Sequence, residues 1–450
     1  MKSSSLFYLS VALLVISTFT LCKKKEVRPV DNPGTEAPVV TPPTVTETPV
    51  VFEQTELLSA ESERKRLQLS WLATDFSATG LFVATSSTIK VNVEQQAGTR
   101  LPTLLIGTYS RYGTWNTQPV TFNLKAGLNE ITSTVDGLIW IRYTNDYPNA
   151  KAKLTFTSGF KKVPYYVAGV TTKNQWKDML SKLNTVPDVI LQGERCMIVA
   201  DRASAIRYQD EDQEVLLSKI SRVIKIEDDF SGLNSAADLD KPNVHQRYLL
   251  TQHEDKAYYM FAYNYRTAYI GTAISAILKP ADVTWGPWHE LGHLHQQVWT
   301  WGAIGEVTVN IFSRAVQREL TPAENRLVSD KIWEQVPAYL ALPDAQRNFN
   351  NDVASVWVRL CMFEQLGLAF GDDFYPKLLS KTRVDKPVVG TDDQKMNYFM
   401  KSACVVSGKD LSIFFKKWGL NVNSAVYAEM AALSLPQPVQ DISLLKDQSN

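Results

Sequence analysis

Histidine, cysteine and net charge are all scarce in this sequence of 450 residues. It has five His and four Cys, and its 47 basic side chains are matched by 47 acidic ones. A neutral chain has no overall field to attract nucleic acid or an anionic membrane, so we expect no nucleic-acid partner. The sequence has no internal repeat. Its length allows two or three domains of about 100–200 residues each.

The cysteines do not predict a disulfide framework. Cys22 follows an apolar N-terminal run, which leaves Cys196, Cys361 and Cys404. An odd number of thiols cannot pair fully within one chain, and the mostly apolar neighbours of each favour buried free thiols. We do not expect these thiols to bind metal. A Cys361–Cys404 disulfide is the open alternative.

Residues 1–22 predict a lipoprotein-type signal peptide. An early Lys and the apolar run Leu6–Leu21 precede Cys22, and the run is short for a membrane span. Cys22 is similar to the acylated cysteine of bacterial lipoproteins, although Phe19 and Leu21 depart from the residues that usually precede it. An ordinary secretory signal and an uncleaved anchor are the alternatives, and all three export the chain.

Residues 23–52 are rich in Pro, Thr and Val and have no helical or strand period, which predicts an extended linker. We therefore expect a lipoprotein of the cell envelope, on the outer membrane and facing the surface or the periplasm, or else a secreted protein. Cys22 is the expected site of lipid attachment. This anchor is then the protein's only contact with a membrane.

The remaining sequence predicts an α+β protein of several domains. From 53 to 160, short alternating stretches such as TIKVNVE and GLIWIRY are separated by turn residues, which predicts a β-sandwich. From 161 to 320, strand patterns and amphipathic helices alternate, as in an α/β catalytic region. From 321 to 440, we expect a helical C-terminal subdomain.

Two short segments carry more specific expectations. YYMFAYNYRTAYIGTAISAIL, at 258–278, is aromatic and β-branched and predicts strands. GTYSRYGTW, at 107–115, is either a sugar-binding edge or a structured hairpin loop, and its composition favours the loop.

Three of the five histidines lie in one stretch, GPWHELGHLHQQ at 286–297. Pro287 suits the first turn of a helix because it lacks the N–H that would be unpaired there. On such a helix His289 and His293 lie one turn apart on one face, the spacing that two imidazoles need to bind one Zn²⁺. Glu290 lies beside the first histidine, where it can take a proton from zinc-bound water.

A catalytic zinc site needs a third protein ligand. The next acid downstream is Glu306, thirteen residues after His293 and at the start of a second predicted helix. Asn310 lies one turn further on the same face and is a candidate to orient a ligand. His295 points to another face, and we interpret it as structural or substrate-facing. Gly292 costs about 1 kcal/mol of helix propensity, which indicates close approach by another backbone or by substrate.

These residues resemble a known family. GPWHELGHLHQQ followed by GEVTVNIFS is similar to the M60-like, or enhancin-like, zinc metallopeptidases, whose pattern is HExxH and a more distant Glu. TGLFVATSSTIKVNV and NEITSTVDGLIWI resemble the β-rich segment that precedes the catalytic region of that family. VRLCMFEQLGLAFGDDFYPKL resembles its helical C-terminal part, so the likeness covers roughly 70–440.

The resemblance implies a gluzincin-type zinc endopeptidase, with its metallopeptidase subdomain at 161–320. His289, His293 and Glu306 would hold zinc, and Glu290 would activate the attacking water and return the proton to the leaving amine. Members of the family cleave mucin-like, O-glycosylated proteins, which are therefore the expected substrate class.

Two further placements follow from the resemblance. A Tyr or His usually stabilises the oxyanion in gluzincins, and Tyr398 and His295 are the candidates for that role. The segment Tyr269–Ile274, directly before the motif helix, is the expected strand edge along which a peptide lies.

Two other functions stay open. The first is a glycan- or mucin-binding surface lipoprotein whose β domain does the work, although a pure binder has no need of Glu290. The second is a zinc aminopeptidase, which shares the ligands. Aminopeptidases commonly anchor the free amine with an acid in a GxMEN-like strand, and no such strand precedes His289.

Overall fold

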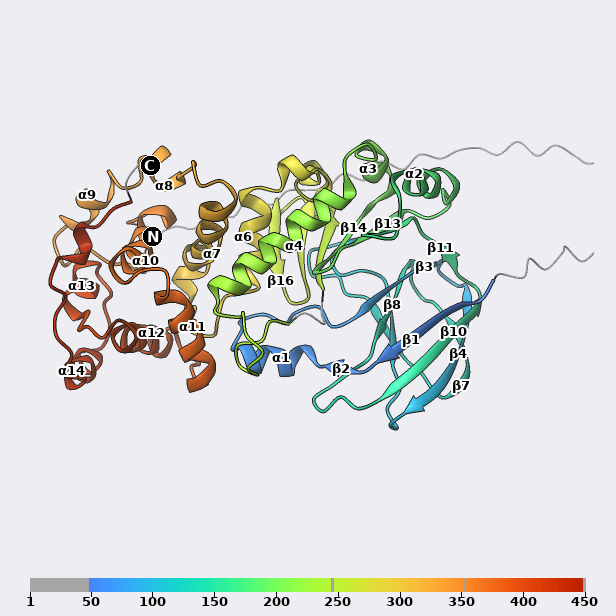
Figure 1. Cartoon of the computed structure of the whole chain (residues 1–450), viewed down its shortest axis with the longest axis horizontal. Helices are drawn as coiled ribbons and strands as arrows, with labels where there is room; N and C mark the ends of the chain where they lie inside the picture. Colours follow the sequence, from blue (N-terminus) through green and yellow to red (C-terminus); the bar gives the residue numbers. More distant parts are fainter. Residues whose placement is uncertain (1–47, 244–246, 352, 448–450) are drawn as a thin grey trace, which may run out of the picture. The chain divides into compact units, whose positions relative to one another are not determined.

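The computed structural model describes residues 48–243, 247–351 and 353–447, which Figure 1 colours from blue to red along the chain. The predicted signal peptide at 1–22, its Cys22 and most of the predicted linker at 23–52 lie outside these residues. Strand β1 begins at Val50, so the last residues of that linker belong to the folded part. In the described part of the chain, no helix is both long and apolar enough to cross a bilayer.

The first part of the fold contains a four-stranded and a five-stranded antiparallel sheet and one short helix, α1 (Ala60–Leu67). The four-stranded sheet has the order β1 (Val50–Thr55), β10 (Lys151–Ser158), β4 (Thr88–Ala97), β7 (Gly127–Thr132). The five-stranded sheet has the order β11 (Lys161–Lys162), β3 (Ser77–Val83), β8 (Gly137–Arg142), β5 (Thr103–Ile106), β6 (Val120–Asn123). Two short strands pair in parallel, β2 (Leu57–Leu58) and β9 (Thr144–Asn145).

Both sheets contribute to one hydrophobic core. Along β4, Ile89, Val91 and Val93 are buried, whereas the residues between them are exposed. This alternation is expected of a strand that has one face covered. Ile139 of β8 and Phe156 of β10 belong to the same cluster, so side chains of the two sheets pack together.

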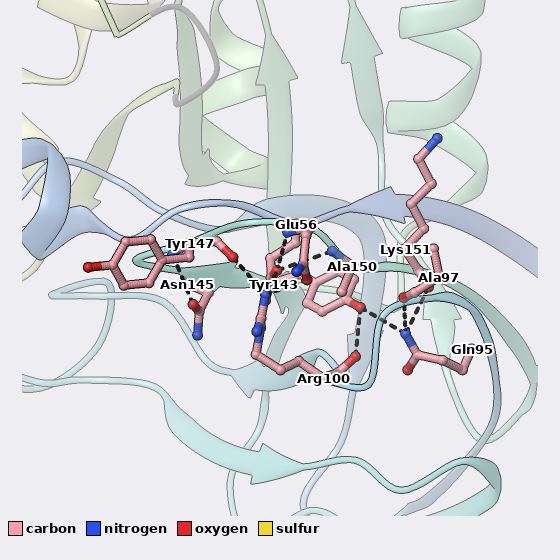
Figure 2. A network of polar contacts seen from close by, with 10 residues as sticks. Glu56, Gln95, Ala97, Arg100, Tyr143, Asn145, Tyr147, Ala150 and Lys151 are labelled. Carbon is pink, nitrogen blue, oxygen red and sulfur yellow. Dashed lines mark hydrogen bonds and ion pairs between the residues drawn. The ribbon is translucent and has the colours of Figure 1, made fainter. Parts of the chain in front are cut away.

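A buried carboxylate fastens the ends of several strands in this first part (Figure 2). Glu56 directly follows β1, and its side chain is 1% exposed. Arg100 donates to both of its oxygens, at 2.6 and 2.5 Å, and the backbone N–H groups of Asn149 and Ala150 donate to it as well. The Tyr143 hydroxyl donates to the Arg100 carbonyl at 2.7 Å. The Arg100 hydrogen bonds are the main cause that holds the pKa of Glu56 below its ordinary value.

The second part is a six-stranded mixed sheet with helices packed on one face. The order is β12 (Tyr165–Val167), β13 (Asp188–Gln192), β14 (Cys196–Asp201), β15 (Tyr248–His253), β17 (Arg266–Ile270), β16 (Met260–Tyr263). The β13–β14 and β17–β16 pairs are antiparallel, and the other pairs are parallel. Side chains from this face share a core with helices α2 (Lys173–Lys182), α3 (Arg202–Arg207) and α4 (Gln213–Phe230).

The opposite face of the six-stranded sheet packs on the first part of the fold. Ile190 of β13 and Leu249 of β15 lie in one cluster with Trp140 of β8. The loop at 107–115 adds polar contacts, because Arg111 donates to Asp188 at 2.9 Å while its own side chain is 2% exposed. This loop is therefore a structured connection, as favoured from its sequence.

The prediction of strands throughout 258–278 is wrong in its second half. After β16 and β17 the chain continues as a 3₁₀ turn, η1 (Gly271–Ala273), and a short helix, α5 (Ser275–Leu278). Ile274, Ile277 and Leu278 repeat at helical spacing and are buried in the core shared with α4. The apolar run therefore fills the core as a helix.

The expected peptide edge at Tyr269–Ile274 is also wrong. Strand β17 lies between β15 and β16, and Tyr269 is fully buried. The edge of the sheet on this side is β16, the strand that forms a hairpin with β17.

The last part of the described chain is helical, as predicted for 321–440 and for the helix that begins near Glu306, and its helices share one core. The helices are α7 (Gly305–Leu320), α8 (Arg326–Ser329), α9 (Val336–Leu340), α10 (Val356–Phe370), α11 (Phe374–Asp385), α12 (Asp392–Ser407), α13 (Ser412–Lys417) and α14 (Ser424–Ala432). Short 3₁₀ turns are η2 (Pro280–Asp282), η3 (Gly302–Ile304) and η4 (Ile442–Leu444). Cys196, Cys361 and Cys404 are buried free thiols, so the alternative disulfide does not form. The mixed α and β class predicted from the sequence is confirmed.

Candidate metal centre

The motif histidines lie on helix α6 (Trp285–His293), and Glu306 is the second residue of α7. One ligand atom from each of His289, His293 and Glu306 lies within 4.8 Å of the other two. His289 Nε2 is 3.0 Å from one carboxylate oxygen of Glu306, and His293 Nε2 is 3.6 Å from the other. The two imidazole planes are perpendicular, with centroids 4.8 Å apart. Three metal-ligating side chains therefore converge on one point.

Gly292 allows α6 and α7 to approach closely enough for this convergence. A Cβ atom at Gly292 would lie 3.1 Å from the carbonyl oxygen of Val309 and 3.1 Å from the Cβ of Phe312, both on α7. The group that approaches Gly292 closely is thus the backbone of the next helix, and not the substrate.

Two amide side chains fix the tautomers of the two imidazoles. Asn310 Nδ2 donates to the Glu306 carbonyl, so its Oδ1 accepts from His289 Nδ1 at 2.9 Å. Gln296 Nε2 donates to Thr308 Oγ1 and to a backbone carbonyl, so its Oε1 accepts from His293 Nδ1 at 2.8 Å. With each Nδ1 engaged in this way, each Nε2 faces Glu306: a protonated ring donates from Nε2 to the carboxylate, and a neutral ring can instead offer the Nε2 lone pair to a metal ion.

The charges in this cluster are unequally solvated. The Glu306 side chain is 69% exposed, and hydrogen bonds from His289 and then His293 hold the pKa of its carboxyl far below the ordinary value. Glu290 is 7% exposed, and its burial raises the pKa of its carboxyl. The two carboxyls therefore differ in exposure and in the direction in which their pKa values are shifted.

A cavity of about 710 Å³ opens over the cluster. Its floor contains His289, Glu290, His293 and Glu306. Its walls include residues from three segments that are distant in the sequence. The first part of the fold contributes Arg64, Ser70 and Trp71, and the edge strand β16 and its neighbour contribute Tyr258, Met260, Phe261 and Ala262. The third segment, at and just before the start of α12, contributes Val389, Asp392 and Lys395. Such a volume accommodates a small ligand or a short stretch of chain.

His295 belongs to the buried framework beneath α6. It is 3% exposed, and its imidazole lies 3.1 Å from Glu227 and 3.2 Å from Asp228, both on α4. Arg195 pairs with Asp228 at 2.8 Å. Of the two roles that the sequence allowed for His295, these buried contacts support the structural one. They also rule out a role in stabilising an oxyanion.

Tyr398 does not line the cavity either. Its hydroxyl donates to Asp385 at the end of α11, at 2.9 Å, and Tyr398 is not among the residues that line the cavity. Neither of the two oxyanion candidates from the sequence therefore faces the cavity.

Several cavity residues were not expected from the sequence. Gln296 sits three residues after His293, a spacing that could have indicated its contact on a helical turn. Asp392 accepts from the Gly302 N–H at 3.1 Å and Lys395 donates to the Thr300 carbonyl at 3.1 Å, so α12 holds the turn that leads to Glu306. No local pattern marks residues this far from the motif.

Comparison with known proteins identifies the family. Residues 159–419 match the family described as Peptidase M60, enhancin and enhancin-like, and residues 58–157 match the N-terminal domain of M60-like peptidases. A solved conserved protein of unknown function from Bacillus anthracis str. Ames is 31% identical, with a TM-score of 0.78 over 89% of this chain and 82% of that one.

Other relatives are more distant. The M60 catalytic domain of ZmpC from Clostridium perfringens, solved in complex with the sialyl T antigen, is 20% identical, with a TM-score of 0.72 over 88% of this chain and 81% of that one. TRPM8 channel-associated factor 3 of Rattus norvegicus is 23% identical over 382 residues, which are 81% of this chain and 40% of the relative, so the chain spans about two-fifths of the length of that protein. Since the first family match extends over more than half of the sequence, the chain belongs to the Peptidase M60, enhancin and enhancin-like family.

Proposed function

We propose that this protein is a zinc-dependent endopeptidase of the gluzincin type that acts outside the cytoplasm on mucin-like, O-glycosylated proteins. The observation that carries the proposal is the convergence of His289, His293 and Glu306 at the floor of an open cavity, with Glu290 beside them. Membership of a peptidase family supports the same reading. The four-stranded and five-stranded sheets share one core, which supports a β-sandwich before the catalytic region.

The donor set suits zinc. Two imidazoles that bind through Nε2 in their neutral form and one carboxylate are the ligands of many catalytic zinc sites, which leave a fourth position open. The Asn310 and Gln296 amides act as the hydrogen-bonded partners that orient ligand imidazoles and increase their basicity. When bound, zinc would polarise the scissile carbonyl and acidify water at the open position.

Glu290 is the proposed general base. Its carboxyl lines the cavity floor beside the histidines. Burial raises the pKa of this carboxyl, which makes it a better acceptor for a proton from the attacking water. The same oxygen can then return the proton to the leaving amine, since the group stays beside the reacting carbonyl throughout.

The edge strand β16 is the proposed platform for the substrate backbone. Its residues Met260–Tyr263 pair with β17 on one side, and Met260, Phe261 and Ala262 line the cavity. An extended peptide can add to such an edge by backbone hydrogen bonds, which places its carbonyl groups along the cavity.

The O-glycosylated substrate class rests on relatives. ZmpC from Clostridium perfringens binds the sialyl T antigen, and another solved metallopeptidase with a TM-score of 0.73 binds the Tn antigen. We extend this chemistry to the present chain. We likewise propose that Cys22 carries lipid and that residues 23–52 hold the enzyme away from an envelope membrane.

The proposed base and ligands are tested separately. Glu290→Gln keeps the size of the side chain but removes the basic oxygen, so the variant should retain zinc and lose cleavage of an O-glycoprotein. His293→Ala removes one ligand, and metal analysis should show loss of zinc. Full cleavage by the first variant would refute the general base, and stoichiometric zinc in the second would refute the ligand assignment.

The substrate class is tested with a mucin-type glycoprotein before and after removal of its O-glycans. Cleavage of the glycosylated form alone is expected. Equal cleavage of both would reject glycan dependence, and cleavage of neither, with retained binding, would favour the glycan-binding lipoprotein. Release of single N-terminal residues would instead favour the aminopeptidase.

A further inference from the structure

Residues 68–72 of the N-terminal domain form part of the wall of the catalytic cavity. Immediately after α1, Leu69 makes an antiparallel bridge to Gln297, just beyond the motif helix. On either side of this bridge, the Val298 N–H donates to the Gln68 carbonyl at 2.8 Å and the Ser70 N–H donates to the Gln296 carbonyl at 2.8 Å. The segment is therefore paired with the chain that follows His293.

The same segment is fixed on its other side by the β16–β17 hairpin. The Leu72 N–H donates to the Asn264 side chain at 2.8 Å, and the Tyr265 N–H donates to the Leu72 carbonyl at 2.7 Å. Trp71, which lies between the two sets of bonds, thus has little freedom to move along the cavity wall. A side chain held in this way loses little entropy when it binds a ligand.

The indole ring of Trp71 packs against a neighbouring aromatic ring and is partly exposed. It packs against the Tyr263 ring with centroids 4.8 Å apart, and Tyr263 in turn meets Trp115 at 5.3 Å. Trp71 lines the cavity together with Tyr258 and Phe261, and it is only partly buried. A partly exposed ring with a rigid aromatic backing is a flat apolar platform.

The platform lines a cavity that combines apolar side chains with hydrogen-bonding groups. Arg64, Ser70, Asp392 and Lys395 line the same space. A pocket for an apolar peptide side chain would be lined mainly by apolar groups. A pyranose ring needs the combination found here, since it has an apolar face formed by C–H groups and an equatorial rim of hydroxyls.

We propose that Trp71 is a specificity-determining residue that binds the apolar face of a pyranose ring on the substrate glycan. The proposal rests on the function proposed above, because it places this sugar beside the peptide bond that the metal centre cleaves. It assigns the N-terminal domain a direct part in reading the substrate, in addition to its packing against the catalytic sheet.

The test compares Trp71→Ala and Trp71→Phe with the wild-type protein, in the full chain loaded with zinc. The substrate is a synthetic peptide that carries one O-linked N-acetylgalactosamine, and the bare peptide is its control. Loss of one stacked ring face should lower kcat/KM for the glycopeptide about tenfold, mainly through KM, and Phe should restore part of the loss. Zinc content and thermal unfolding, measured on each variant, show whether the fold and the metal site are intact.

Tyr259→Ala is the matched control, because Tyr259 is an aromatic residue that is 65% exposed close to the cavity but does not line it. This variant should cleave the glycopeptide at the wild-type rate. Wild-type kinetics for Trp71→Ala, or an equal loss of affinity for glycosylated and bare peptide, would overturn the proposal.

Binding measurements in the Glu290→Gln background separate the two levels of inference. Calorimetry should show that the glycopeptide binds more tightly than the bare peptide and that Trp71→Ala abolishes the difference. If the wild-type protein cleaves nothing but this Trp71-dependent preference remains, the peptidase function fails and the sugar platform stands. If cleavage requires the glycan but not Trp71, the function stands and the platform fails.

Discussion

Replacing Gly292 by alanine is the sharpest test of how α6 and α7 assemble the metal centre. The added methyl would lie 3.1 Å from the Val309 carbonyl oxygen, 3.1 Å from the Cβ of Phe312 and 3.2 Å from a Val309 methyl. Ordinary carbon contacts are about 3.5–4.0 Å, so the two helices must separate by roughly 0.4 Å. Two of these three atoms, the Val309 carbonyl oxygen and the Phe312 Cβ, cannot rotate away.

The balance of energies favours a loss of stability. Alanine gains about 1 kcal/mol over glycine in helix propensity, whereas an extra methyl in a tightly packed contact costs about 1–3 kcal/mol. We expect Gly292→Ala to lower the free energy of unfolding by about 0–2 kcal/mol. Because α6 carries His289 and His293 while α7 carries Glu306, we also expect about tenfold weaker zinc binding.

Gly367→Ala is the matched control for this prediction. Gly367 lies inside α10, and a Cβ there meets a Tyr375 ring carbon at 3.6 Å, an ordinary contact. Alanine should therefore stabilise this helix by up to about 1 kcal/mol and leave zinc affinity unchanged. Urea unfolding and competition with a chromogenic chelator measure both quantities. Wild-type zinc affinity and stability in Gly292→Ala would refute the argument that close helix packing sets the ligand geometry.

Three further variants test other parts of the structure. Asn310→Ala removes the acceptor that orients His289, so zinc affinity measured by chelator competition should fall about 10- to 100-fold; an unchanged affinity would contradict this. Glu56→Gln should destabilise the protein near neutral pH. Because folding lowers the pKa of Glu56 from 4.5, the wild-type advantage should shrink as the pH falls below that value, and a difference constant from pH 7 to pH 3 in urea unfolding would argue against the ionised anchor. Tyr398→Phe loses the hydroxyl that bonds to Asp385 and should keep the wild-type kcat, whereas a large loss would restore Tyr398 as an oxyanion candidate.

Local spacing predicted the residues that converge at the centre, and tertiary pairing decided those that surround it. His289 and His293 are one helical turn apart, so their common face follows from the sequence alone. Glu306 was identified as the next acid downstream at the start of a predicted helix. These inferences need only the geometry of a helix and the chemistry of zinc.

The surrounding residues depend on contacts that a linear pattern does not contain. Gln296 acts as an acceptor because its amide nitrogen is occupied by Thr308 on the next helix. Trp71 reaches the cavity through backbone pairing with Gln297, far away in the sequence. The strand prediction failed at 271–278 for a related reason, since an apolar run that is buried on several sides has no period to distinguish strand from helix.

The pairing of residues 68–70 with 296–298 also constrains the order in which the molecule can form. Ser70 and Gln297, which share a hydrogen bond, are 227 positions apart in the chain. Contacts of such long range form slowly, because a large loop must close before they contribute any stability. The cavity wall is synthesised early but reaches its place only after the motif helix has emerged. We therefore expect the complete cavity to form late in the folding of this protein.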